Sequence, residues 1–190
     1  MKSQVRVVGI DDSPFAFRDG RVLVIGVVVR LPQYVEGVMR TECTVDGTDA
    51  NDALEEMISR SRFFEQLKLI MIDGVALGGF NVVDIARLHR ETGIPCVTVT
   101  RDPPDMVEIG RALKAHFPDW EERLETIAKQ ELTAIPTPHN PIFISVAGTS
   151  VEVASRLIRE CTVRGNIPEP IRIAHLIASA VVKGESKGRV

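Results

Sequence analysis

Two short apolar runs, each ending in aspartate, constrain the fold of this chain more than any other feature. Residues Leu67–Asp73 are mostly apolar and stop at an acid followed by Gly74. The run is too short for a typical helix, so it predicts a strand buried on both faces of a parallel sheet. Residues Val5–Ile10 form a second run of this kind and continue into Asp11.

The two aspartates follow their strands directly, which places them at strand ends. If the strands are parallel neighbours, Asp11 and Asp73 emerge at the same edge of the sheet, where open α/β folds bind their ligands. The pattern therefore predicts two carboxylates within reach of one cation. The alternatives are that Asp73 is a turn residue before glycine and that Asp11 caps a strand end.

The periodicity elsewhere predicts an α/β protein. Strands are expected at 21–30, 37–46, 94–100, 131–135 and 142–146, and helices at 49–64, 81–92, 106–116, 120–129, 149–162 and 171–182. Three antiparallel strands, a helix and then parallel strands with crossover helices is the order of elements in the RNase H-like fold. Such a mixed sheet carries helices on both faces. We expect one domain across residues 1–190, with a disordered tail at 183–190.

Composition narrows the class of protein. The formal net charge of −3 argues against a strong non-specific hold on nucleic acid. The start of the chain has no signal-peptide pattern, and no apolar run approaches the roughly 20 residues of a membrane span. We therefore expect a cytoplasmic protein without a membrane partner. The scattered Cys43, Cys96 and Cys161 lie in apolar segments, which predicts buried reduced thiols.

Several motifs in fixed order carry a resemblance to a known family. They are Gly9-Ile10-Asp11, the turn Tyr34-Val35-Glu36-Gly37, Ile72-Asp73-Gly74, a strand from Ile94-Pro95 ending at Arg101, and the late Pro168–Arg172. Together they resemble endonuclease V of the RNase H-like superfamily over almost the whole chain. The closest resemblance is to its archaeal branch, whose members share motifs in the style of Val45–Ala50 and Ala174–Ala180.

The resemblance implies a nuclease that cleaves phosphodiesters of DNA or RNA with Mg²⁺ or Mn²⁺ held by carboxylates. Hard cations of this kind take oxygen ligands, which agrees with Asp11 and Asp73 as the bridging pair. Endonuclease V places a glutamate after the third strand, just before the helix. The candidates here are Glu42, Asp46 and Asp49, and Asp46 fits that position best.

Two further residues are expected to meet nucleic acid. Arg101 falls where the family's nucleases carry a lysine, and we expect it to contact phosphate; a solvated charge at a strand end is the alternative. Tyr34 matches part of the family's wedge turn. Asp12 is an extra acid beside Asp11; it either adds to the site or faces away, as neighbours on a strand point to opposite sides. His175, on the last helix, either faces the acidic edge or is an ordinary half-exposed histidine.

The chain also departs from the family pattern. It has Ala147–Ser150 where endonuclease V carries a histidine near a helix start, and Val75–Gly79 replace the residues that help to read a displaced base. The sequence therefore predicts a metal-dependent nuclease and leaves two alternatives. One is a non-catalytic module that binds nucleic acid or protein, and the other is an enzyme acting on a small phosphoester.

Overall fold

The computed structural model describes residues 5–186, which contain a seven-stranded sheet, a two-stranded ribbon and six α-helices. The strands of the sheet are β1 (Arg6–Asp12), β2 (Arg21–Arg30), β3 (Tyr34–Thr44), β4 (Leu67–Asp73), β7 (Cys96–Thr100), β8 (Thr133–Ile135) and β9 (Ile142–Ala147). The ribbon pairs β5 (Ala76–Leu77) with β6 (Asn81–Val82). The helices are α1 (Ala50–Ser59), α2 (Ile85–Thr92), α3 (Met106–His116), α4 (Trp120–Ala128), α5 (Val151–Glu160) and α6 (Glu169–Lys183).

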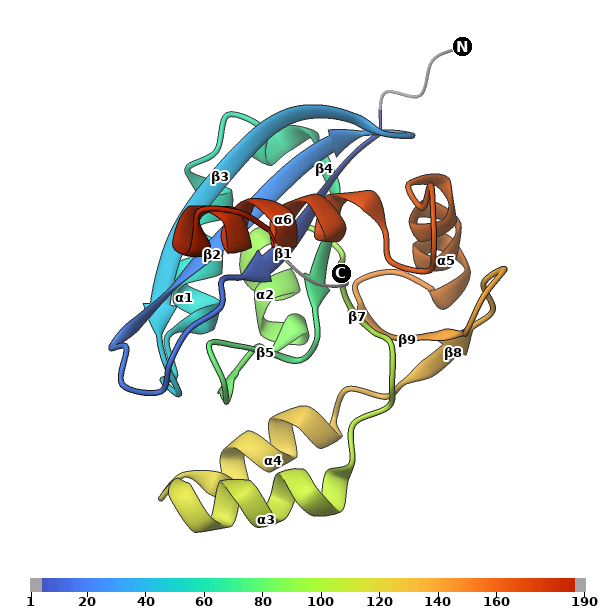
Figure 1. Ribbon diagram of the computed structural model, residues 1–190. Coiled ribbons are helices and arrows are strands. Elements are labelled where there is room, and N and C mark those ends of the chain that lie inside the picture. Colours follow the sequence, from blue (N-terminus) through green and yellow to red (C-terminus); the bar gives the residue numbers. More distant parts are fainter. Residues whose placement is uncertain (1–4, 187–190) are drawn as a thin grey trace.

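The strand order β3-β2-β1-β4-β7-β9-β8 explains where the two acidic strand ends lie (Figure 1). β1, β2 and β3 form an antiparallel meander, as expected, while β1, β4 and β7 run parallel. β9 returns antiparallel to β7, and β8 pairs with β9. This is the predicted mixed α/β sheet with the order of an RNase H-like fold.

Two hydrophobic cores lie on the two faces of the sheet. Helices α5 and α6 cover one face and bury Val7, Leu69 and Met71, while α1 and α2 cover the other face, which contains Val8 and Ile70. Neighbouring residues of a strand alternate between these faces. Helices α3 and α4 form an antiparallel pair beyond the carboxyl ends of the parallel strands (Figure 1).

Gly9 allows α6 to approach the sheet closely. A Cβ atom at this position would overlap the backbone of Pro170 and Ile171 in the first turn of α6. Ile171, Ala174 and Ala178 then pack into the core on the α6 face. The close approach fixes the height of α6 above β1.

Several predicted boundaries were wrong by a few residues. The third strand spans Tyr34–Thr44 instead of 37–46, because the chain leaves the sheet before the left-handed residue Asp46. The helix predicted at 81–92 begins only at Ile85, where the Asp84 side chain caps the amide of Arg87. Asn81 is instead buried in the β6 ribbon.

The structure also bears on what was expected of the cysteines, of membrane spans and of the C-terminal tail. The three cysteines are buried and free, as predicted. None of the described helices combines the length and the apolar character needed to cross a bilayer. Of the tail predicted at 183–190, Lys183 ends α6, Gly184 follows as a left-handed cap, and residues 187–190 lie outside the described part of the chain.

Candidate active site

Asp11 and Asp73 end neighbouring parallel strands at the same rim of the sheet. Ile10 of β1 pairs with Ile72 of β4, so the next residue of each strand is an aspartate. Asp11 and Asp73 follow the alternation of the residues that face α5 and α6, so both carboxylates belong to that face. The adjacency predicted from the two apolar runs is confirmed.

Asp11 is almost completely buried, with 4% of its surface exposed. Its Oδ1 accepts a 2.8 Å hydrogen bond from the amide of Asp12, and its Oδ2 lies 2.8 Å from Nδ1 of His175. With Asp11 ionised, the tautomer that fits has a proton on Nδ1, which donates to the carboxylate. The α6 helix therefore supplies a hydrogen-bond partner to the end of β1.

The surroundings of the two aspartates disfavour the ionised form of both carboxyl groups. Burial raises the pKa of Asp11 to about 8, and the nearby charges of Asp73 and Asp12 act in the same direction. Burial also raises the pKa of Asp73, against the lowering effects of Arg101 and His175. A cation bound at this rim would stabilise the ionised forms that burial disfavours.

Arg101 lies close enough to both aspartates to lower their pKa values. It follows β7 directly, and its alternation with Val97 and Val99 places it on the α6 face. The residue is exposed, so its guanidinium is accessible to a ligand at this rim. The structure thus brings together Arg101, Asp11 and Asp73, three of the residues singled out in the sequence.

Asp12 faces the opposite side of β1, and its Oδ2 accepts the amide hydrogen of Gly78. Burial is the main cause of its raised pKa, and the charge of Asp73 adds to it. Asp12 therefore ties the β5–β6 ribbon to the end of β1. The sequence showed the extra acid but not this contact, because the contact joins residues 66 positions apart.

Asp46 is not brought to the Asp11–Asp73 pair. It lies in the turn after β3 with a left-handed φ of 56°, and its Oδ1 accepts a 2.8 Å hydrogen bond from the amide of Phe80. A Cβ atom at Gly79 would overlap the same oxygen, so the loop is built closely around Asp46. The carboxylate that adds its charge to the pair is Asp12.

The other two candidates for a third carboxylate also have local partners. Glu42 is half-exposed and forms an ion pair with Arg21. Asp49 accepts hydrogen bonds from the amide and hydroxyl of Thr44 and from the side chain of Asn81. These contacts connect the end of β3 to the start of α1.

Tyr34 lies at the opposite rim. It begins β3 and pairs with Arg30, whose other neighbour is Arg6 at the start of β1. Asp11 is therefore five residue steps along β1 from this level, roughly 17 Å. Tyr34 is 60% exposed and lies under the Arg30 guanidinium, 4.8 Å from ring centroid to Cζ. The structure separates Tyr34 from the acidic pair.

The carboxylate oxygens of Asp11 and Asp73 suit a hard cation that takes few ligands from the protein. Within residues 5–186, no group of three or more His, Cys, Asp and Glu side chains is arranged to hold a metal ion. Mg²⁺ commonly binds through one or two carboxylates and keeps several waters. The buried Asp11 and the partly buried Asp73, whose charge acts on Asp11, match that requirement.

Comparison with known proteins identifies the family. The family described as Endonuclease dU matches residues 3–182. The chain belongs to the endonuclease dU family. A UPF0215 protein of Methanosarcina barkeri is 44% identical over 190 residues, covering 100% of this chain and 96% of the relative.

Solved structures show a similar fold in one archaeal relative and in endonuclease V. A protein of Archaeoglobus fulgidus, titled as being of unknown function, has a TM-score of 0.84 at 42% identity, covering 95% of this chain and 99% of its own. The catalytic domain of human endonuclease V has a TM-score of 0.62 at 20% identity, covering 95% and 83%. Endonuclease V of Ciona intestinalis, solved with inosine-containing DNA, has a TM-score of 0.59 at 18% identity, covering 90% and 82%. The endonuclease V-like fold and the archaeal relatives expected from the sequence motifs are confirmed.

Proposed function

We propose that this member of the endonuclease dU family is a divalent-metal-dependent endonuclease that hydrolyses phosphodiester bonds in nucleic acid. The observation that carries the proposal is the placement of two aspartates, the buried Asp11 and the partly buried Asp73, at adjacent parallel strand ends, where the charge of Asp73 acts on Asp11. The family is described as Endonuclease dU, and we read dU as the abbreviation of deoxyuridine. DNA that contains deoxyuridine is therefore the first substrate to test.

Asp11 and Asp73 would hold Mg²⁺ or Mn²⁺, which, when bound, supplies a water of lowered pKa and polarises the phosphoryl group. The protein's own groups have separate roles around this pair. His175 donates to Asp11 Oδ2 and so fixes the direction of the other carboxylate lone pairs. Arg101 offers a planar set of donors to the oxygens of the scissile phosphate.

Endonuclease V carries a histidine near the start of the helix that corresponds to α5, and this chain does not. His175 lies near the acidic pair instead. Ser150 caps the start of α5, and its hydroxyl accepts the amide hydrogen of Val153. The imidazole beside the acids comes from α6 instead. We infer that α6 provides the histidine function of this site, which removes the main argument for a non-catalytic module.

The proposal is tested by a cleavage assay on matched oligonucleotides. The substrates are a labelled DNA strand with one deoxyuridine, the same strand with thymidine or deoxyinosine, and an RNA version, each single-stranded and as duplex. We expect cleavage of the deoxyuridine strand with Mn²⁺ or Mg²⁺, and none with EDTA.

The variants identify the site. Asp73→Asn should abolish cleavage, whereas Asp52→Asn, an equal charge change on the exposed surface of α1, should leave it intact. Binding of these oligonucleotides without cleavage under any metal would instead support the non-catalytic module. Cleavage that persists in Asp73→Asn would exclude the proposed site.

A further inference from the structure

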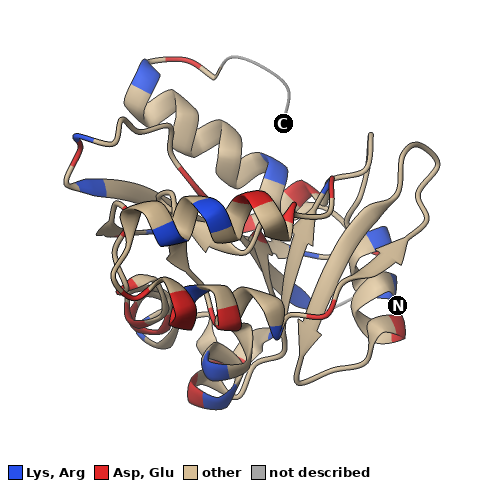
Figure 2. Cartoon of the chain, turned by 90° about the horizontal axis from the view of Figure 1, so that it is seen from below, with Lys and Arg blue, Asp and Glu red and all other residues tan. Residues whose placement is uncertain are grey.

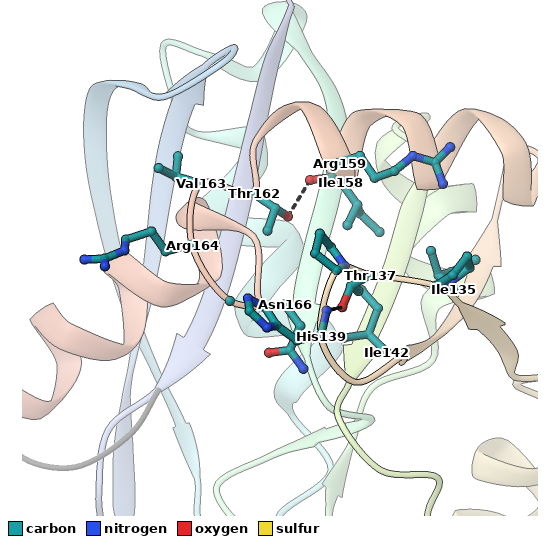
Figure 3. Close-up of a pocket in the computed structure, with 13 residues that line it drawn as sticks. Ile135, Thr137, His139, Ile142, Ile158, Arg159, Thr162, Val163, Arg164 and Asn166 are labelled. Atoms are coloured by element: carbon teal, nitrogen blue, oxygen red, sulfur yellow. Dashed lines mark hydrogen bonds between the residues drawn. The ribbon is translucent and has the colours of Figure 1, made fainter.

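A second concave site lies away from the aspartates, between the turn that joins β8 to β9 and the connection from α5 to α6. Its volume is about 510 Å³, within the range of pockets that bind small organic groups. Figure 3 shows Thr137 and Ile142 from the first segment and Thr162 and Asn166 from the second around this space, while Arg159 and Arg164 extend outward from its edge. Among the residues that line it are Pro136, Pro138, His139, Arg159, Arg164 and Asn166.

The floor of the cavity is apolar and rigid. Ile135, Ile142 and Ile158 are each at most 5% exposed and belong to the core under α5 and α6. Pro136 and Pro138 add two flat, apolar side chains from the β8–β9 turn. A planar ring system would find an apolar surface here without the need to open the core.

The mouth of the cavity carries positive charge only. Arg159 and Arg164 line it beside the imidazole of His139, and no aspartate or glutamate does. Within residues 5–186, neither arginine forms an ion pair, and both are exposed. Acidic and basic residues are interspersed elsewhere on the helices seen in Figure 2, in keeping with the net charge of −3. The cavity is therefore a local site of positive potential on an acidic protein.

Hydrogen bonds hold the two walls in place. Thr137 closes the β8–β9 turn by donating to the carbonyl of Asn140 at 2.8 Å and accepting from the amide of His139. Asn166, from the α5–α6 connection, donates to the same Asn140 carbonyl at 3.4 Å. Thr162 donates to the carbonyl of Ile158 at 2.7 Å (Figure 3). The cavity is preformed, which reduces the entropic cost of binding.

The cavity and the acidic pair share one rim of the sheet. Phe143 of β9 pairs with Thr100, the residue before Arg101, and Ile142 is the next residue toward the rim. From β4 to β9 or β8 is two or three strand spacings, roughly 10–14 Å. That distance corresponds to about three or four nucleotide steps of a B-form strand. A strand cleaved at the aspartates would reach the cavity within a few nucleotides.

We propose that this cavity binds one nucleotide of the substrate strand, at a position a few residues from the scissile phosphate. The base lies on the isoleucine and proline floor, and Arg159 and Arg164 contact its phosphates. The apolar floor and the unpaired arginines fit an anionic ring compound. That this compound is a nucleotide of the substrate strand rests on the proposed nuclease function. The contact is independent of the metal and of base identity.

The test measures binding in EDTA, where cleavage does not interfere. A 5′-labelled 12-nucleotide oligothymidylate is titrated with the full chain and followed by fluorescence anisotropy. Arg159→Gln/Arg164→Gln should weaken binding at least tenfold and reduce the slope of log K against log salt by about 1.4. The matched control, Lys68→Gln/Arg90→Gln, makes the same charge change at the opposite rim and should bind like the wild type.

A second variant tests whether the base enters the cavity. Thr162→Phe fills part of the space without changing charge, and circular dichroism checks that it folds. It should weaken binding of oligothymidylate but not of an abasic strand of the same length. Equal binding by Thr162→Phe and the wild type, or an equal loss in both double variants, would overturn the proposal.

The same proteins separate this inference from the nuclease proposal. Loss of binding in Arg159→Gln/Arg164→Gln together with no Mn²⁺-dependent cleavage by the wild type would retain the cavity and reject the nuclease. Cleavage by the wild type with unchanged binding by the double variant would retain the nuclease and reject the cavity.

Discussion

Asp11 and His175 are 164 positions apart in the chain and are joined by a 2.8 Å contact between Oδ2 and Nδ1. The contact connects the end of β1 to the middle of α6, which otherwise packs on the sheet through apolar side chains. His175 is only partly exposed, so its ring is held between the helix and the carboxylate. The candidate active site thus depends on the docking of α6 as well as on the strand ends.

The first prediction concerns His175 itself. His175→Ala should lower Mn²⁺ affinity and cleavage about 10- to 100-fold, because loss of a hydrogen bond to a metal-binding carboxylate typically costs that much. Calorimetric titration with Mn²⁺ measures the affinity directly. His175→Gln, which keeps a side-chain donor, should recover part of the loss, and the exposed His116→Ala should have no effect. Unchanged Mn²⁺ affinity in His175→Ala would show that the histidine does not position Asp11.

The second prediction concerns the close contact between β1 and α6. Gly9→Ala introduces a methyl group that overlaps the backbone of Pro170 and Ile171, and overpacking of this kind costs about 1–3 kcal/mol. The shift of α6 should also weaken the His175–Asp11 contact and lower cleavage. Urea unfolding gives the free energy, and Gly20→Ala, where the new methyl group meets nothing within 4 Å, is the control. Equal stability of the two variants would contradict the packing argument.

The sequence was sufficient to predict the acidic pair because each aspartate ends a short apolar run, and the order of strands then makes those runs parallel neighbours. It was not sufficient for His175. That residue's neighbour is set by the height of α6 above Gly9, a tertiary contact that no local pattern reveals. Asp46 was the best local match for a third ligand, but the left-handed turn after β3 directs its carboxylate to Phe80. Local spacing could not predict that turn.

The third prediction concerns the cost of the buried acids. Burial and the charge of Asp73 raise the pKa of Asp11, so its ionised form destabilises the metal-free protein. Asp11→Asn removes this unfavourable free energy. It should therefore raise the melting temperature in EDTA by about 2–4 °C for each kcal/mol removed. It should also abolish the further stabilisation that Mn²⁺ gives the wild type. Thermal scans with EDTA and with Mn²⁺ measure both effects, and a lower melting temperature in EDTA would contradict this account.

The fourth prediction is a pH dependence away from the site. Burial opposes ionisation of Asp49, but hydrogen bonds from Thr44 and Asn81 outweigh it and lower the pKa of this carboxyl. A group with a depressed pKa stabilises the fold above its unfolded pKa, near 3.8, and loses that effect as the pH falls through the folded value.

Asp49→Asn tests this assignment. It should reduce the free energy of unfolding by at most about 1 kcal/mol at pH 7, since the side chain is partly screened by solvent. The difference from the wild type should shrink as the pH falls below 3.8. Denaturant unfolding of both proteins at pH 7 and pH 3 measures it. A difference that grows toward low pH would have the wrong sign for this network.

The fifth prediction concerns the α3–α4 pair, which the buried Arg123 helps to attach to the loops behind the site. Arg123, 8% exposed, donates to the carbonyls of Asp46, Gly47 and Phe80, at 3.1, 2.9 and 2.7 Å. Its guanidinium also lies over the ring of Phe117, 4.4 Å from the centroid. The three carbonyls belong to the turn after β3 and to the loop that precedes β6.

Arg123→Ala should leave these carbonyls without their donor and destabilise the fold by about 2–4 kcal/mol. Hydrogen exchange should increase first at Phe80, whose amide donates to Asp46, and at Gly78, whose amide donates to Asp12. Arg111→Ala, on the exposed side of α3, should change neither quantity. Because Asp12 borders Asp11, loosening this loop should also lower Mn²⁺ affinity. Faster exchange confined to α3 and α4, with Gly78 still protected, would show that the α3–α4 pair docks independently of the site.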